Sequence, residues 1–220
     1  CAPLALPSDM THLHGKGSSM IENVVFDLGG VLMHFDPIGF SRLFTDTEED
    51  AGLICQTLFK SLNWAYLDAG AISEDAALLI AKSKLPERLH PNVEQALAEW
   101  DLKRTPIQET NDLAAKIKQA GYGVYILSNA GVRFPRIVER IPCHDSIDGW
   151  MASAFEHIVK PDPEIYRRFC ERFDLAPQSC AFTDDNQDNV TGALAAGMRA
   201  HLFRGANDLE DWLKDEGLKL

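Results

Sequence analysis

The sequence predicts an α/β fold built on a doubly wound, mainly parallel sheet, with an all-helical segment inserted after its first strand. Three observations support this prediction. From about residue 101 onward, short apolar runs typical of buried strands alternate with amphipathic helical segments. Glycine follows several of these helical segments, at the position where a helix commonly ends. Between about residues 37 and 100, apolar residues recur at the i, i+3, i+4 and i+7 spacing of packed helices.

The predicted elements follow one another in a regular order. An apolar run at residues 21–28 (IENVVFDL), closed by Gly29 and Gly30, predicts the first buried strand. Ser73 is the expected N-cap of a helix within the inserted segment. The later elements alternate, and they are a helix at 110–120, a strand at 123–128, a short strand at 149–153, a helix at 163–173, a strand at 179–184, a helix at 189–196, a strand at 199–203 and a terminal helix at 207–217.

The composition of the 220-residue chain argues against nucleic acids and membranes as partners. Its 33 acidic and 21 basic residues leave a net charge of −12, which argues against nucleic acid as the main partner. No apolar run approaches the ~20 residues that span a bilayer, so no membrane partner is predicted. Because targeting signals are absent, a cytoplasmic location is the default expectation. The five scattered cysteines contain no CxxC pair and so indicate neither a disulfide framework nor a zinc knuckle.

Polar residues stand at the end of each predicted strand that carries a motif. Asp27 ends the first strand, Ser128 and Asn129 end the second, and Asp184 with Asp185 end a third. Lys160 lies in a polar turn, VKPDPEIY, just before a helix. In a parallel sheet the carboxyl ends of the strands meet at one edge, where ligands bind. We therefore expect these side chains to gather at a single site.

Three carboxylates at one site require a compensating charge. Two unit charges ~4 Å apart repel by ~4 kcal/mol at an effective dielectric constant of ~20, so the site needs a raised pKa or a bound cation. Ligands that offer only oxygen suit Mg²⁺, which also binds substrate phosphate. Ser128, Asn129 and Lys160 would supply hydrogen bonds and positive charge to the remaining phosphate oxygens. An aspartate can act as the nucleophile toward phosphorus.

Four motifs in order resemble those of the haloacid dehalogenase superfamily. They are FDLGGVL at 26–32, LSN at 127–129, KPDPEIY at 160–166 and TDDNQDNVTGALAAGM at 183–198. The resemblance implies a Rossmann-like core from residues 20–36 and 101–220 and a helical C1-type cap from residues 37–100. The stretch WAYLDAGAISEDAA at 64–77 is similar to the caps of bacterial sugar-phosphate phosphatases, including an α-glucose-1-phosphate phosphatase, and to the phosphatase half of soluble epoxide hydrolases. Residues 1–19, before Met20, are predicted to be an N-terminal extension or residues added to the natural chain.

The resemblance also implies a metal site. Asp27 would be both the nucleophile and a Mg²⁺ ligand. Asp185 would be the metal ligand of the fourth motif, and Asp184 would bind the metal directly or through water. The backbone carbonyl of Gly29 would complete the metal's shell.

The remaining motif residues would handle the phosphate. Ser128 and Asn129 would hold the phosphoryl group, while Lys160 would orient it and balance charge. The implied reaction is the Mg²⁺-dependent hydrolysis of a small phosphate monoester, with a sugar phosphate favoured, through an aspartyl-phosphate on Asp27. A small phosphorylated metabolite is the expected partner, and the chain is expected to be a monomer or a homodimer.

One position departs from the family's pattern. Phosphatases of this family usually carry a second aspartate two residues after the nucleophile, as general acid and base, and this sequence has Gly29 there. A missing general acid typically costs ~10²–10⁴-fold in rate. Three explanations stay open: a good leaving group such as an anomeric sugar oxygen, a substitute residue such as His34 or Asp36, or a weak catalyst. We favour the first.

Two alternative functions follow from that departure. A protein that binds a phosphorylated metabolite without turning it over would also tolerate Gly29. A 2-haloacid dehalogenase also lacks the second aspartate, but its attack on carbon needs no metal. Adjacent Asp184 and Asp185 would then be a liability, and Arg42 is a poor match for the arginine that dehalogenases carry soon after the first motif.

Overall fold

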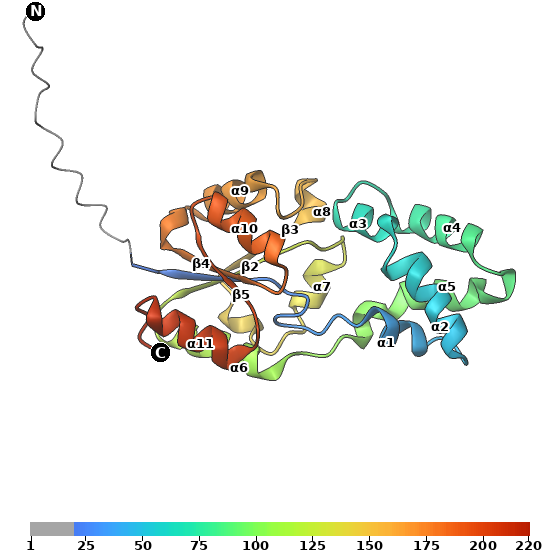
Figure 1. Ribbon diagram of the computed structural model, residues 1–220, viewed down its shortest axis with the longest axis horizontal. Coiled ribbons are helices and arrows are strands. Elements are labelled where there is room, and N and C mark those ends of the chain that lie inside the picture. Colours follow the sequence, from blue (N-terminus) through green and yellow to red (C-terminus); the bar gives the residue numbers. More distant parts are fainter. Residues whose placement is uncertain (1–19) are drawn as a thin grey trace, which may run out of the picture.

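The structure is a computed structural model that describes residues 20–220, so the predicted N-terminal extension at 1–19 lies outside the described residues. Two parts are visible in Figure 1: a sheet covered by helices, and a helical lobe that comprises residues 37–103. The lobe lies between the first two strands in the sequence, and it stands beyond the carboxyl ends of the strands. Within residues 20–220, none of the helices combines the length and the apolar character needed to cross a membrane.

The sheet confirms the predicted α/β class. Its strands are β1 (Asn23–Phe26), β2 (Gly123–Ser128), β3 (Gly149–Ala152), β4 (Cys180–Asp184) and β5 (Arg199–Leu202). All of them are parallel, in the order β3-β2-β1-β4-β5. The chain runs outward from β1 through β2 to β3 and then returns to place β4 on the other side of β1. The carboxyl ends of β1 and β4 therefore flank the point where the strand order reverses, which is where such sheets bind ligands.

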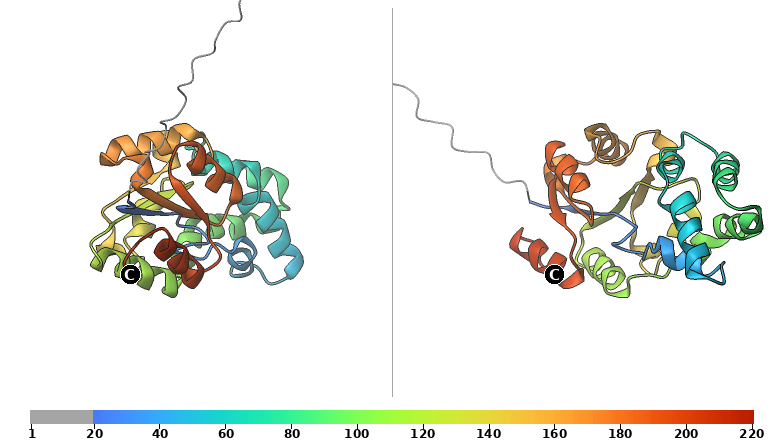
Figure 2. Two further views of the ribbon diagram at one scale, coloured as in Figure 1. Left: turned by 60° about the vertical axis from the view of Figure 1, so that its left-hand side comes forward. Right: turned by 45° about the vertical axis from the view of Figure 1, so that its right-hand side comes forward.

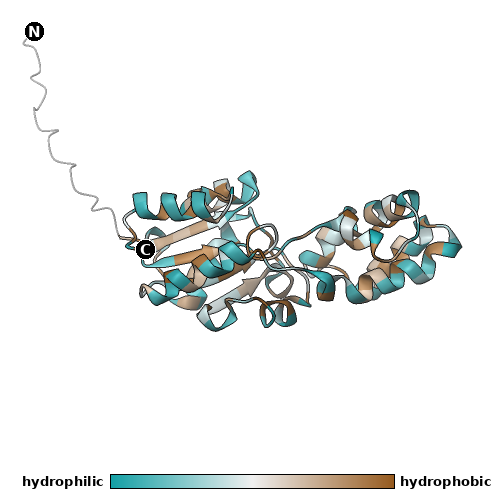
Figure 3. Cartoon of the chain, turned by 90° about the horizontal axis from the view of Figure 1, so that it is seen from below, coloured by the Kyte–Doolittle hydropathy of each residue, from teal (hydrophilic) through white to brown (hydrophobic). Residues whose placement is uncertain are grey.

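Two layers of helices cover the sheet (Figures 1 and 2). On one face lie α6 (Gln108–Gln119) and α11 (Ala206–Asp215), and on the other lie α9 (Pro163–Phe173) and α10 (Gln187–Ala195). Side chains of β1 alternate between the two cores, because successive residues of a strand point to opposite faces. Val24 and Phe26 pack with residues of α6 and α11, and Val25 packs with residues of α9. Figure 3 shows the result as apolar strands between helices whose outer surfaces are hydrophilic.

The helical lobe is built from short helices around an aromatic cluster. Its elements are α1 (Pro37–Arg42), α2 (Glu48–Ile54), a π-helical turn η1 (Cys55–Phe59), α3 (Leu62–Asp68), α4 (Glu74–Lys84), η2 (Glu87–Leu89), α5 (His90–Glu99) and η3 (Trp100–Lys103). The Ser73 hydroxyl accepts a hydrogen bond from the backbone N–H of Ala76, as predicted for the N-cap of α4. At the centre, the ring centroids of Trp64 and Trp100 lie 5.0 Å apart in an edge-to-face arrangement.

Short elements that the sequence did not reveal connect the strands. They are α7 (Phe134–Val138), η4 (His144–Ser146), α8 (Ser153–Glu156) and η5 (Pro177–Ser179). None is long enough to show a helical period, so periodicity could not have found them. The loop that leads from β2 into α7 matters for function, because it borders the candidate site.

Candidate active site

Lys160 lies at the centre of the site and joins the ends of three strands. Its side chain is buried, and its Nζ donates to Asp27 Oδ1 at 2.8 Å, Asp184 Oδ2 at 2.6 Å and the backbone oxygen of Leu127 at 2.9 Å. These three bonds use all three donors of the ammonium group. Burial alone would lower the pKa of Lys160, but Asp27 and Asp184 more than offset this effect and raise it. The lysine is therefore held charged beside the predicted nucleophile.

Asp184 is the most enclosed carboxylate of the site. It is fully buried, and it accepts hydrogen bonds from the backbone N–H of Asn186 at 2.8 Å and from the side-chain amide of Asn189 at 3.0 and 3.1 Å, in addition to the bond from Lys160. Asn189 is in turn held at the start of α10. Both oxygens of Asp184 are thus engaged, and the residue fixes Lys160 and the β4–α10 loop in place.

Asp27, Asp184 and Asp185 form a carboxylate cluster in which one oxygen from each side chain lies within 4.8 Å of the others. Burial and the negative charge of Asp184 raise the pKa of Asp27, while Lys160 and a hydrogen bond from Ser128 oppose the rise. Burial, Asp27 and Asp184 likewise raise the pKa of Asp185 to about 6. One lysine charge does not neutralise three carboxylates. This all-oxygen cluster therefore fits a hard divalent cation such as Mg²⁺.

Gly30 lets the backbone pass close to this cluster. A Cβ atom at position 30 would lie 2.1 Å from Asp185 Oδ2, and the residue has a positive φ of 77°. Glycine is the residue that meets both demands, because it has no Cβ and adopts positive φ at low cost. Its neighbour Gly29, whose carbonyl is a predicted metal ligand, borders the same cleft.

Ser128 and Asn129, the predicted phosphate-binding residues, stand at the end of β2 beside Asp27. Ser128 is buried and hydrogen-bonds Asp27. The Asn129 side chain pairs with the backbone of Lys160: its Nδ2 donates to the Lys160 oxygen at 2.9 Å, and its Oδ1 accepts from the Lys160 N–H at 2.8 Å. In this structure Asn129 therefore also positions the lysine turn, a role that its place in the sequence did not indicate.

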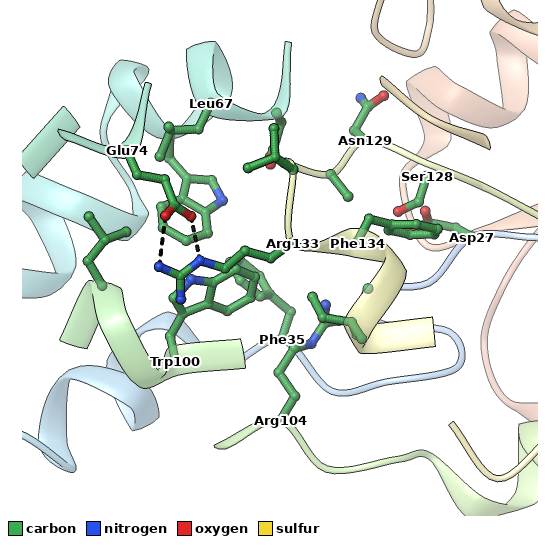
Figure 4. A pocket seen from close by; sticks show the side chains of 18 of the residues that line it. Asp27, Phe35, Leu67, Glu74, Trp100, Arg104, Ser128, Asn129, Arg133 and Phe134 are labelled. Carbon is green, nitrogen blue, oxygen red and sulfur yellow. Dashed lines mark hydrogen bonds and ion pairs between the residues drawn. The ribbon is translucent and has the colours of Figure 1, made fainter. Parts of the chain in front are cut away.

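A cleft of ≈600 Å³ opens between the sheet and the helical lobe, as Figure 4 shows. Its floor holds the polar residues described above, with Asp27, Lys160 and Asp185 all bordering it. Its other walls combine aromatic and aliphatic side chains with charged ones. The apolar side chains are Phe35, Trp64, Leu67, Leu97, Trp100, Phe134 and Ile137, and the charged ones are Asp68, Glu74, Asp75, Arg104 and Arg133. The cleft thus joins a strongly polar end to a body in which an aromatic and aliphatic surface lies beside charged groups.

Comparisons with known proteins agree with this arrangement. Residues 21–197 match the family of hydrolases described as haloacid dehalogenase-like. The chain belongs to the haloacid dehalogenase-like hydrolase family. It is 27% identical over 206 residues to the phosphatase MT3486 of Mycobacterium tuberculosis, covering 87% of this chain and 91% of that protein. It is 29% identical over 180 residues to the sesquiterpene phosphatase astK of Aspergillus oryzae, covering 79% and 85%.

The fold of this hydrolase is shared with solved members of the family. A variant of a family enzyme from Bacteroides thetaiotaomicron, in complex with magnesium and inorganic phosphate, superposes with a TM-score of 0.67 at 19% identity, covering 87% of this chain and 98% of that one. The predicted family membership and the predicted fold class are therefore confirmed.

An ion-pair network ties the helical lobe of the hydrolase to its core. Arg133, in the loop after β2, donates from Nη2 to Glu74 of α4 at 2.8 Å (Figure 4). Its Nη1 donates to Asp101 of η3 at 2.9 Å. Asp101 is fully buried and also accepts from Arg136 of α7. Sequence reasoning missed this network, because its members are far apart in the chain and form no motif.

Arg104 is a buried cation beside Gly29. Its guanidinium donates to the backbone oxygens of His34 at 3.1 Å and Met33 at 3.3 Å and lies over the ring of Phe35. Within the described residues, no carboxylate forms an ion pair with it. Burial lowers the pKa of Arg104 to about 10, which leaves the side chain charged at neutral pH. A Cβ at Gly29 would lie 3.6 Å from Arg104 Nη2.

Asp68 is a carboxyl group that the helical lobe contributes to the cleft. It ends α3, borders the cleft and accepts a hydrogen bond from the backbone N–H of Gly131. Its backbone oxygen accepts a hydrogen bond from Ser153. Burial, followed by the charge of Asp27, raises the pKa of Asp68 to about 8, against the opposing influence of Arg104.

The substitute acids suggested by the sequence lie elsewhere. His34 and Asp36 are exposed, and neither is among the residues that border the cleft. Asp36 instead caps α1 by accepting from the Gly39 N–H at 3.0 Å. The sequence suggested His34 and Asp36 because they lie close to Asp27 along the chain. Asp68, by contrast, is brought to the site by the packing of α3 on the core.

Proposed function

We propose that this hydrolase cleaves a small phosphate monoester in a Mg²⁺-dependent reaction, through an aspartyl-phosphate on Asp27. The observation that carries the proposal is the position of Asp27, which borders the cleft next to a buried, charged lysine and two further carboxylates. The phosphatases among its relatives support the same class of reaction.

The residues present fit the proposed metal. Asp27 and Asp185 would hold Mg²⁺ together with the carbonyl of Gly29, and Asp184 would complete the carboxylate cluster. When bound, the metal would supply positive charge that lowers the repulsion between Asp27 and the phosphate dianion. The magnesium and phosphate present with the Bacteroides enzyme support this choice of cation.

The side chains of this protein carry out the remaining catalytic steps. An oxygen of Asp27 attacks phosphorus, and the bond from phosphorus to the ester oxygen breaks. Lys160 stabilises the charge on the transferring phosphoryl group, and its three hydrogen bonds hold it in place during the reaction. Ser128 and the free N–H of the Asn129 amide would contact the phosphoryl oxygens. Water then hydrolyses the acyl phosphate and restores Asp27.

The carboxylate cluster argues against a dehalogenase. An attack on carbon without a metal would leave Asp184 and Asp185 beside the nucleophile with one lysine to balance three carboxylates. Charge repulsion at this range opposes ionisation of the nucleophile. A bound divalent cation removes that problem, so the cluster favours metal-dependent phosphoryl transfer.

The walls of the cleft bear on the alcohol part of the substrate. A sugar phosphate is the prediction from the sequence. Sugar hydroxyls need polar partners, however, and the part of the wall around Trp64, Trp100 and Phe134 offers aromatic and aliphatic surface. Of the charged residues in the wall, Arg133 and Glu74 are already paired with each other. Burying an apolar group against the aromatic and aliphatic surface would release ~25 cal/mol for each Å² removed from water. This lining favours the phosphate ester of an apolar or aromatic alcohol over that of a sugar.

The experiment that tests the proposal is phosphate release from a matched panel with Mg²⁺ and with EDTA. The panel contains glucose 1-phosphate, glucose 6-phosphate, benzyl phosphate and p-nitrophenyl phosphate. We expect Mg²⁺-dependent release that EDTA abolishes, with kcat/KM at least about tenfold higher for benzyl phosphate than for either sugar phosphate. A preference for glucose 1-phosphate would overturn the apolar assignment but retain the phosphatase. Absence of release from all four substrates would overturn the phosphatase and favour the binding protein.

A further inference from the structure

The cleft contains two positions from which a carboxylic acid could serve the leaving group, and they differ in how closely they approach the guanidinium of Arg104. One is position 29, where the family's second aspartate is replaced by glycine. The other is Asp68, which enters the same cleft from the helical lobe. The Cβ position of Gly29 lies 3.6 Å from Arg104 Nη2. Asp68 forms no ion pair with Arg104 among the described residues, although the charges of Arg104 and Asp27 both influence its pKa.

Position 29 is poorly suited to an acid in this chain. A side chain there would begin 3.6 Å from the Nη2 of Arg104, a buried guanidinium without a carboxylate partner among the described residues. A carboxylate at that distance would form a charge-assisted pair with the arginine. Such a pair stabilises the ionised form and lowers the pKa of the acid. An aspartate at position 29 would therefore carry no proton to donate at neutral pH.

Asp68 has the surroundings that an acid needs. The Gly131 N–H holds its side chain, and the Ser153 hydroxyl holds its backbone oxygen, so both ends of the residue are tied to the core. The same Ser153 hydroxyl accepts from the Ala130 N–H at 3.0 Å, and Ala130 directly follows the phosphate-binding pair Ser128 and Asn129. Asp68 is thereby fixed against the loop that leads from the phosphoryl site, although it belongs to a different part of the fold.

We propose that Asp68 is the general acid and base of this enzyme, supplied by the helical lobe in place of the residue that is missing at Gly29. This inference rests on the proposed phosphatase function. In the first step, Asp27 attacks phosphorus and the carboxyl proton of Asp68 passes to the departing ester oxygen, which leaves as a neutral alcohol. In the second step, the Asp68 carboxylate takes a proton from the water that attacks the aspartyl-phosphate. Phosphate leaves, and both residues return to their starting states.

The charges around Asp68 agree with this cycle. Burial is the larger influence on its pKa, and the negative charge of Asp27 adds to it. Arg104 and the Gly131 N–H act in the opposite direction and keep the pKa near 8. The Arg133–Glu74 pair, which also borders the cleft, is internally balanced. A carboxyl group with a pKa near the working pH can both give and take a proton within one turnover.

The test compares leaving groups of different quality in the wild-type enzyme and in Asp68→Asn. With benzyl phosphate, whose alcohol needs a proton to leave, we expect the variant to lose ~10²–10⁴-fold in kcat/KM. With p-nitrophenyl phosphate, whose leaving group needs little protonation, kcat/KM should fall less than about tenfold. Because the base for the second step is also lost, a rapid-mixing experiment should show a burst of one p-nitrophenol per active site, followed by slow turnover.

The pH profile of the wild-type enzyme provides a second test that needs no variant. An acid must be protonated to donate, so kcat/KM for benzyl phosphate should fall as pH rises through about 8, the pKa of Asp68. The profile for p-nitrophenyl phosphate should lack most of that decline. Asp46→Asn is the matched control, because Asp46 is an exposed carboxylate of the helical lobe that does not border the cleft. We expect its rates to stay within about twofold of wild type.

The outcomes separate the two proposals. If wild-type enzyme releases no phosphate from either ester, the phosphatase function itself fails. If wild type is active but Asp68→Asn loses the same factor on both esters, or loses nothing, Asp68 is not the acid. The Asn side chain can still accept from the Gly131 N–H, so we expect a thermal midpoint within a few degrees of wild type. If Asp68→Asn unfolds, the pH dependence of kcat/KM in the wild-type enzyme still tests whether Asp68 is the acid.

Gly29→Asp gives an independent prediction. If Arg104 holds a carboxylate at position 29 ionised, the substitution should not raise the rate on benzyl phosphate, and it should not rescue Asp68→Asn. A gain of tenfold or more in either background would contradict the inference, because it would mean that position 29 can host a working acid. The measurement is kcat/KM for benzyl phosphate at pH 7 in the four combinations of these two substitutions.

Discussion

Asp27→Asn should abolish Mg²⁺-dependent phosphate release, with a loss of about 10⁴-fold or more, as is typical when a nucleophile is removed. An amide oxygen is a far weaker nucleophile than a carboxylate, and the change also removes one charge from the proposed metal site. The fold should persist, because Lys160 keeps its bonds to Asp184 and to the Leu127 oxygen. The measurement is phosphate release from p-nitrophenyl phosphate, with the thermal midpoint recorded alongside.

Asp188→Asn is a suitable control for that experiment. Asp188 is an exposed aspartate in the first turn of α10, close in sequence to the carboxylate cluster but outside it. We expect it to retain at least half of the wild-type rate. An Asp27→Asn enzyme with undiminished turnover would remove the nucleophile assignment and, with it, the aspartyl-phosphate.

Lys160→Met should lower both activity and stability. It leaves the buried carboxylates of Asp27 and Asp184 adjacent without their shared cation. Removing one partner of a buried ion pair typically destabilises a protein by about 3–5 kcal/mol. We expect a loss of about 10³-fold in kcat, because the lysine would also stabilise the transferring phosphoryl group. Both effects can be measured on one preparation, by denaturant unfolding and by phosphate release.

The stability loss in Lys160→Met should depend on pH in a defined direction. Burial and Asp184 already raise the pKa of Asp27 in the wild-type protein, and loss of the lysine raises it further. An acid whose folded pKa exceeds its unfolded pKa stabilises the folded state at low pH, and that stability is lost as pH rises through the folded pKa. The variant should therefore be closer to wild type at pH 5 than at pH 8. A deficit that is equal at both pH values would argue for lost packing rather than lost charge.

The two proposals place the catalytic groups of one reaction on both parts of the fold. The core would supply the nucleophile, the lysine and the metal site, while the helical lobe would supply the acid and much of the apolar wall. Arg133 and Arg136 join the lobe to the core through three ion pairs. Loosening this connection would be expected to slow protonation of the leaving group before it affects attack by Asp27.

Local patterns in the sequence determined most of the fold and the centre of the site. The apolar runs that became β1, β2 and β4 indicated which residues end each strand, because an apolar run and the polar or glycine residues that close it are local properties. Parallel pairing of β1 with β4 then brought Asp27 and Asp184 together, and the turn before α9 places Lys160 in contact with both, as the sequence predicted. The order of the four motifs was enough to indicate the family.

The tertiary structure alone decided what surrounds that centre. Arg104 reaches Gly29 across 75 positions, and Asp68 meets the Gly131 loop only because α3 packs on the core. Contacts of this kind depend on how side chains far apart in the chain pack against one another. They produce no periodicity or motif spacing in the sequence from which they could be predicted. The identity of the proposed acid is therefore a property of the packed lobe, whereas the proposed nucleophile stands at the end of a strand that the sequence predicts.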